Sequence, residues 1–458
     1  MTNKKIESVI LPPRGSDKTF DITITDDIVT SVTPSCSTPH PHPYPSLLLP
    51  TLCHPHLHLD KAYLLTSNNP TYSHLAPKTA SFSEALTATA QAKSLYTEED
   101  LYLRGAQLLS TIYTQGATTA RTFVEVDATT GTLPLTVARK LKHEFAHLIE
   151  VQIVAFAQEP LFSKEDGGAN LRILTEVLDS EALSDISVLG TTPYVESDRD
   201  ASLRNIRWAI QTAMDKHLHL DFHLDYTLAL QTDEVGNPYE PLTMAVAGIL
   251  RHDDWTRLNH GRTVVLGHAT QFAQLPPHWL AMVARAIEGL PVHFVGLPTS
   301  DLFMMGRDAA HPKPRGTLPV VEMIRSHGIN CCLGVNNVGN AFTPYGNGDL
   351  LGLACWGVGL YQVSAEGDAE VLYGCVSWRA RRAIGLAEER DGDGEEGGEM
   401  EVREGMRWRG GLVVENREVV EVPGREGERG IRVPARQRRS VRDVVWDPPD
   451  VGLRRVVR

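Results

Sequence analysis

The sequence lacks long apolar runs and clustered cysteines. No stretch approaches the ~18 apolar residues of a membrane span, so no membrane partner is expected. Residues Met1 to Ile10 are polar and lack the apolar core of a secretory signal peptide. The six cysteines are scattered without a C-x-x-C pair, a pattern typical of buried free thiols in a reducing compartment. These absences predict a soluble cytoplasmic protein.

The sequence also lacks an excess of basic residues. Lysine and arginine number 44 against 57 aspartates and glutamates, and the formal net charge is −13. A general binder of nucleic-acid phosphates would show the opposite balance, so no nucleic-acid partner is expected. With 458 residues, of which 42% are hydrophobic, the chain can bury one core of barrel size or two to three smaller ones.

The two ends of the chain differ from its middle in composition and in the spacing of apolar residues. Residues 6–35 alternate apolar and polar side chains, as half-buried antiparallel strands do, and the connector 40–45 is a Pro- and His-rich loop. After about Glu388 the sequence becomes acidic and glycine-rich, which is typical of disorder. Strand character returns at 411–414 and 441–446. We therefore predict that residues 1–48 and 386–458 form a small β domain around a central unit, 49–385.

The central unit repeats short apolar runs between amphipathic stretches. The intervening stretches, such as 135–144, 200–216 and 277–287, are long enough for helices. Eight strands separated by helices predict a parallel (β/α)8 barrel of the TIM type. A doubly wound open sheet is the competitor, but no Gly-rich nucleotide fingerprint follows the first strand. The runs are 47–58, 117–126, 149–156, 187–194, 218–223, 263–268, 292–297 and 330–334.

Histidines stand at the ends of these predicted strands. His54, His56 and His58 follow one another at intervals of two, which places all three on one face of a strand. His223 and His268 close the fifth and sixth runs. Because barrel active sites lie at the C-terminal ends of the strands, we expect His56, His58, His223 and His268 to converge there, around a divalent metal.

The same residues form an ordered series of motifs. Pro55-His56-Leu57-His58-Leu59-Asp60-Lys61 is followed by similar segments at 121–127, 153–159, 221–225, 306–307, 315–317 and 342–349. Over residues 5 to 385 the chain resembles the amidohydrolase superfamily, in particular its cytosine deaminase-like branch. The resemblance implies a metal-holding barrel with a small β-sandwich formed by the N- and C-terminal segments. It also implies a small-molecule substrate. A homo-oligomer is compatible with the resemblance, which does not decide the oligomeric state.

The resemblance assigns roles residue by residue. His56, His58 and His223 match metal ligands for one divalent ion, zinc or iron. His268 matches the histidine that polarises the attacking water or the developing oxyanion, and Gln158 matches the amide that holds the heterocycle. His54 is not needed as a ligand. Asp60 and Lys61 receive no role beyond shaping their loop.

Two positions depart from the family pattern. Tyr226 stands where the proton-shuttling glutamate is expected, and Asn336 stands in place of a metal-binding aspartate. A phenol titrates near ~10 and an amide does not titrate, so neither replaces a carboxylate as an acid–base group. Asn336 is expected to bind the metal weakly through its carbonyl oxygen. Tyr226 is expected to donate a hydrogen bond to the oxyanion, and Asp301 or Asp225 to protonate the leaving group.

These observations leave two hypotheses. In the first, metal-bound hydroxide attacks an amidine or amide carbon and cleaves a non-peptide C–N bond of a small, cyclic nitrogenous substrate. Three neutral histidines on zinc are enough to bring the pKa of a bound water to ~7. In the second, the replacements at Tyr226 and Asn336 mark a non-catalytic homologue that binds a ligand or a partner.

Overall fold

The computed structural model describes residues 3–35, 44–66, 69–163, 167–229, 239–306, 316–387 and 400–458. Arg307, Arg315, most of the Pro- and His-rich connector and most of the acidic segment after Glu388 lie outside these residues. In the described part of the chain, no helix combines the length and apolar character needed to cross a bilayer.

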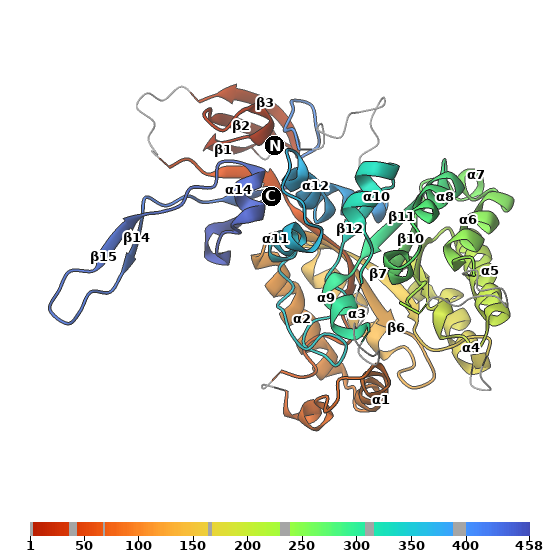
Figure 1. Cartoon of the computed structure of the whole chain (residues 1–458). Coiled ribbons are helices and arrows are strands. Elements are labelled where there is room, and N and C mark those ends of the chain that lie inside the picture. Colours follow the sequence, from red (N-terminus) through yellow and green to blue (C-terminus); the bar gives the residue numbers. More distant parts are fainter. Residues whose placement is uncertain are drawn as a thin grey trace.

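Eight parallel strands form the central barrel, as predicted (Figure 1). Each strand pairs with the next along the chain, and the ring closes beside the first strand. There His58 N–H donates to the Asn336 carbonyl (2.8 Å), and Asn336 N–H donates to the His56 carbonyl (3.2 Å). The strands are β5 (Leu52–His58), β6 (Ala117–Glu125), β7 (Glu150–Ala157), β8 (Ile186–Thr191), β9 (His219–Leu224), β10 (Val264–His268), β11 (Val292–Gly296) and β12 (Cys331–Leu333).

Helices lie between successive strands and cover the outside of the barrel (Figure 1). The cap of α5 (Arg199–Lys216) shows how their ends are fixed: the Asp198 carboxylate accepts from Ala201 N–H at 2.9 Å. The remaining barrel helices are α1 (Phe82–Lys93), α2 (Glu98–Thr114), α3 (Leu133–Phe145), α4 (Gly167–Leu178), α6 (Leu242–His252), α7 (Trp255–Leu258), α8 (His278–Ile287), α9 (Pro298–Met304), α10 (Val320–His327), α11 (Leu350–Leu360), α12 (Asp368–Cys375) and α13 (Trp378–Ala383).

The predicted first run, 47–58, is two strands. The first half, β4 (Leu47–Pro50), leaves the barrel and pairs antiparallel with β13 (Gly411–Val414), which pairs in turn with β16 (Arg454–Val457). Side chains on β4 alternate between two cores: Leu47 and Leu49 pack with the barrel helices, whereas Leu48 packs into the small domain. The N- and C-terminal segments are therefore joined by hydrogen bonds at the start of the barrel.

The opposing layer of the small β-sandwich comes from the N-terminus. Strands β1 (Asn3–Val9), β2 (Phe20–Thr25) and β3 (Ile28–Pro34) form an antiparallel sheet, as the alternating pattern predicts. Buried side chains from this sheet pack against Leu48, Val413 and Trp408. A separate hairpin, β14 (Val419–Val422) with β15 (Ile431–Pro434), projects from this domain (Figure 1).

One predicted strand is wrong. Residues 441–446 form a helix, α14 (Val441–Trp446), because Ser440 Oγ accepts from Asp443 N–H and caps its first turn. The valines of this segment are buried against α11 and α12. Local capping and docking on helices thus outweigh the preference of valine for strands.

Candidate metal centre

Three histidines converge at the C-terminal ends of the strands. His56 and His58 come from β5 and His223 from β9, and all three are buried. The His223 Nε2 lies 3.2 Å from His56 Nε2 and 3.3 Å from His58 Nε2. Their ligand atoms all lie within 4.8 Å of one another, the grouping expected of a metal site.

The spacing of these nitrogens fits a metal ion. Nitrogen ligands at ~2.0–2.1 Å from a tetrahedral zinc lie roughly 3.3–3.4 Å apart, close to the observed distances. Burial, together with neighbouring positive charges, lowers the pKa of all three imidazoles well below its usual value. They are therefore neutral near pH 7, the form that binds a metal.

His54 does not join the cluster. The register of β5 against β6 shifts between His54 and Leu57, so strict alternation fails there. As a result Cys53 packs inside the barrel with Val265, and His54 is buried away from the histidine cluster. The expectation that three consecutive histidines share one face is wrong for His54, because a bulge cannot be read from side-chain spacing.

Asn336 lies beside the cluster, immediately after β12. Its backbone closes the barrel against His56 and His58, and φ is 66°. The side-chain Oδ1 is buried and has no hydrogen-bond partner among the described residues. A buried amide oxygen without a partner fits a weak oxygen ligand for a cation.

His268 is held by a buried carboxylate. Its Nδ1–H donates to Asp301 Oδ1 at 2.8 Å, and the second carboxylate oxygen accepts from Thr317 Oγ1 at 2.6 Å. Burial raises the pKa of Asp301 above its usual range, and these two hydrogen bonds oppose that rise. The His268 ring centroid lies 5.1 Å from that of His223, at the edge of the candidate metal position.

Aromatic side chains enclose the cavity in front of the histidines. The Tyr226 ring lies 4.2 Å from the His268 ring, and Tyr194 and Phe82 lie 5.4 Å and 6.1 Å from Tyr226. Burial and the charge of Asp301 raise the pKa of Tyr226 well above 10, so the phenol keeps its proton. The enclosed space is about 20 Å³, enough for about one water molecule.

The side chain of Lys61 also lines this cavity. The sequence alone did not predict this position for Lys61. Its Nζ contacts Glu125 Oε1 at 2.5 Å and donates to Gln158 Oε1 at 3.3 Å. Glu125 also contacts Lys93, which pairs with Asp127. Although burial acts to raise it, the pKa of Glu125 is held below its usual value by the two lysines. Lys61 is therefore a buried ammonium beside Gln158, and its loop is not an exposed one.

The carboxylate of Asp225 already accepts three hydrogen bonds. It accepts from Leu242 N–H (2.9 Å), Thr243 N–H (3.1 Å) and Thr243 Oγ1 (2.7 Å), and so fixes the start of α6. These contacts suit a structural cap better than a proton donor.

Comparisons with known proteins agree with this arrangement, although no family model matches the chain. N-isopropylammelide isopropyl amidohydrolase of Pseudomonas sp. (strain ADP) is 23% identical over 350 residues, covering 74% of this chain and 75% of the relative. The structure of 5-methylcytosine deaminase from Klebsiella pneumoniae, liganded with 5-fluorocytosine, superposes with a TM-score of 0.73 at 22% identity. That likeness covers 90% of this chain and 91% of the deaminase.

A second similar structure contains a metal. Atrazine chlorohydrolase from Arthrobacter aurescens, complexed with zinc, superposes with a TM-score of 0.56 at 15% identity, covering 90% of this chain and 87% of that chain. Three observations fit a metal-dependent barrel: the closed parallel sheet, the histidine cluster at the C-terminal ends of its strands, and the sequence similarity to an amidohydrolase. The chain is similar in sequence to this amidohydrolase and in fold to the deaminase and the chlorohydrolase.

Proposed function

We propose that this protein is a metal-dependent hydrolase that cleaves a C–N bond, other than a peptide bond, in a small cyclic nitrogenous compound. The observation that carries the proposal is the spacing of His56, His58 and His223, with His268 next to them. The similarity to an amidohydrolase and to a deaminase supports the same reaction class.

The ligand set suits a divalent cation, with zinc favoured by the neutral imidazoles and by the zinc in a similar structure. When bound, such an ion would supply Lewis-acid chemistry, which lowers the pKa of a coordinated water to about 7. His56, His58 and His223 would hold it, with Asn336 as a weaker oxygen ligand.

His268 is the proton-handling residue of the proposed reaction. Because Nδ1–H donates to Asp301, Nε2 of the neutral ring is an acceptor. It lies at the cavity that receives the substrate, where it can take the proton of the attacking water and pass it to the leaving nitrogen. Asp301 acts through His268 as a positioning residue, rather than by donating a proton to the substrate.

The cavity of about 20 Å³ must widen before a ring can enter, and its walls then select the substrate. Phe82, Tyr194, Tyr226 and Phe342 present aromatic faces that suit a flat ring. Lys61 occupies Oε1 of Gln158 and the Gln158 amide also hydrogen-bonds Tyr194, which leaves one amide N–H to donate toward a ring carbonyl or nitrogen. Tyr226, which keeps its proton, donates a hydrogen bond to the developing oxyanion.

The proposal is tested by metal analysis and by a substrate screen. Purified protein is expected to contain about one zinc, iron or manganese ion per chain and to release ammonia or an amine from a pyrimidine, a triazine or a cyclic urea. His56→Ala should abolish both, whereas His252→Ala, at an exposed histidine, should change neither. A wild-type protein without stoichiometric metal would contradict the proposal.

A non-catalytic scaffold is the second candidate, because Tyr226 and Asn336 replace the family carboxylates. The double variant Tyr226→Glu with Asn336→Asp distinguishes the two. If the native chain turns over no substrate and the double variant gains deaminase activity, the scaffold is correct.

A further inference from the structure

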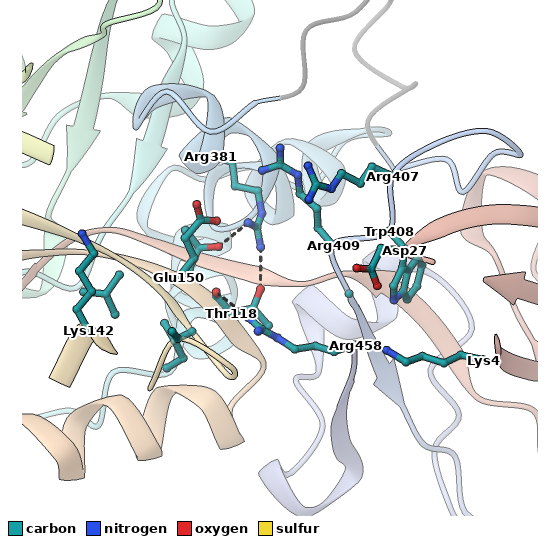
Figure 2. A pocket seen from close by; sticks show the side chains of 15 residues that line it. Lys4, Asp27, Thr118, Lys142, Glu150, Arg381, Arg407, Trp408, Arg409 and Arg458 are labelled. Carbon is teal, nitrogen blue, oxygen red and sulfur yellow. Dashed lines mark hydrogen bonds between the residues drawn. The ribbon is translucent and has the colours of Figure 1, made fainter. Parts of the chain in front are cut away.

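A second pocket lies at the opposite end of the barrel from the histidines (Figure 2). Its volume is about 530 Å³, within the range of small-ligand sites. Thr118, Thr119 and Glu150 line it from the starts of β6 and β7, whereas the metal centre lies at the strand ends. The small β-sandwich forms the facing wall, so the pocket is separate from the proposed active site.

The pocket is strongly basic in an acidic protein. Its cationic side chains are Lys4, Lys142, Arg381, Arg407, Arg409 and Arg458. Against these six stand two carboxylate side chains, Asp27 and Glu150. Among these side chains, cations outnumber anions three to one. The chain as a whole carries −13, so this concentration of positive charge is local.

The half-buried cations of the pocket are held by neutral groups. Arg381 donates to the hydroxyls of Thr119 (2.5 Å), Thr51 (2.6 Å) and Thr118 (2.9 Å). Arg458 donates to the His147 carbonyl at 2.8 Å, and Lys142 to the Asp185 carbonyl at 2.8 Å. These acceptors orient Arg381 and Arg458 without neutralising them, whereas the Asp185 carboxylate partly offsets the charge of Lys142.

Repulsion within the pocket is therefore only partly relieved. Burial lowers the pKa of both Arg381 and Arg458, and in each case a neighbouring arginine of the pocket lowers it further. Glu150 is the carboxylate near both. A bound anion would supply the missing negative charge and use the N–H groups that face the cavity.

We propose that this pocket binds a small polyanion that carries several phosphoryl groups. The cations are spread around the wall: Arg407 and Arg409 lie beside Arg381, the Arg458 guanidinium lies near Arg381 at Thr118, and Lys142 and Lys4 lie on opposite sides (Figure 2). A ligand with one anionic group would reach only part of this set. A ligand with several phosphoryl groups matches both the number of positive charges in the pocket and the distance over which they are spread. An arginine guanidinium can bind each phosphoryl group through two parallel hydrogen bonds.

The experiment is a calorimetric titration of the full chain with inorganic triphosphate, with citrate as a carboxylate polyanion for comparison. Saturable binding of triphosphate is expected with Kd below about 1 mM, and weaker binding of citrate. Arg407→Gln with Arg409→Gln should weaken triphosphate binding by about tenfold or more. Both arginines are exposed, and circular dichroism and Tm check that the double variant folds.

Matched controls separate a specific site from general charge. Arg429→Gln with Arg432→Gln removes the same charge from the projecting hairpin and should leave Kd within about twofold. Lys4→Gln is an independent variant that should also weaken binding. No saturable triphosphate binding, an equal loss in both double variants, or tighter binding of citrate would overturn the proposal.

Discussion

Asp301 and His268 form a buried hydrogen-bonded pair, with 2.8 Å between Oδ1 and Nδ1. The contact fixes the ring orientation and leaves Nε2 for the cavity. Asp301→Asn should therefore lower kcat by roughly 10²- to 10⁴-fold, because an amide favours the wrong tautomer of His268, while the metal content stays unchanged. Steady-state kinetics with parallel metal analysis checks this. Full activity in Asp301→Asn would remove Asp301 from the mechanism.

Metal content should depend on the three clustered histidines and not on their neighbour. His58→Ala and His223→Ala should each lose stoichiometric metal, because each removes one of three imidazole ligands. His54→Asn is a matched control, since His54 lies on the same strand and is also buried. It should retain metal. Loss of metal from His54→Asn but not from His58→Ala would mean that the wrong face of β5 has been assigned.

Glu125 compensates two buried ammonium groups. Its carboxylate oxygens each contact one lysine at 2.5 Å, Lys61 and Lys93. Glu125→Gln should lower the free energy of unfolding by about 3–5 kcal/mol, because it leaves buried positive charge without its carboxylate. Glu176→Gln breaks an exposed pair with Arg172 and should cost less than about 1 kcal/mol. Urea unfolding of both variants measures the difference.

His219 should make stability depend on acid pH. Burial, with Arg121 and Arg262 nearby, lowers its pKa to about 2 in the folded protein, against an ordinary value of 6.5. The unfolded chain therefore binds a proton that the folded chain excludes, so this contribution is complete above pH 6.5 and is lost as the pH falls toward 2.

Replacing His219 by Asn should flatten the decline in unfolding free energy between pH 7 and pH 4. The measurement is urea unfolding at several pH values in this window. His252→Asn, at an exposed position, should leave the slope unchanged. An unaltered slope in His219→Asn would show that other groups dominate acid unfolding.

Periodicity predicted the barrel well because parallel strands buried on both faces read as short apolar runs. It also placed His56, His58, His223 and His268 at one end, since strand ends of a barrel share an edge. Periodicity did not predict the features that depend on irregular backbone. The bulge that turns His54 away and the capped helix at 441–446 each contradict a pattern that is correct for regular structure.

The Lys61–Glu125–Lys93 network was missed for a different reason. Charged residues in a sequence are read as exposed, because an isolated buried charge is very costly. These three lie on a loop, a strand end and a helix, and only the fold shows that Glu125 pairs with both lysines while Asp127 supplies the second carboxylate. The available signal was the position of Lys61 directly after the histidine motif and of Glu125 at a strand end.

The pairing of β4 with β13 imposes an order on synthesis. Leu47–Pro50 leaves the ribosome about 360 residues before Gly411–Val414, its hydrogen-bonding partner. At a synthesis rate of about 5–20 residues per second, the edge of β4 that pairs with β13 stays unpaired for roughly 20–70 s. Every barrel strand is synthesised during this time. Premature release of a chain that ends before residue 411 would leave an unpaired leucine strand at the end of the barrel opposite the histidines, a target for chaperones or aggregation.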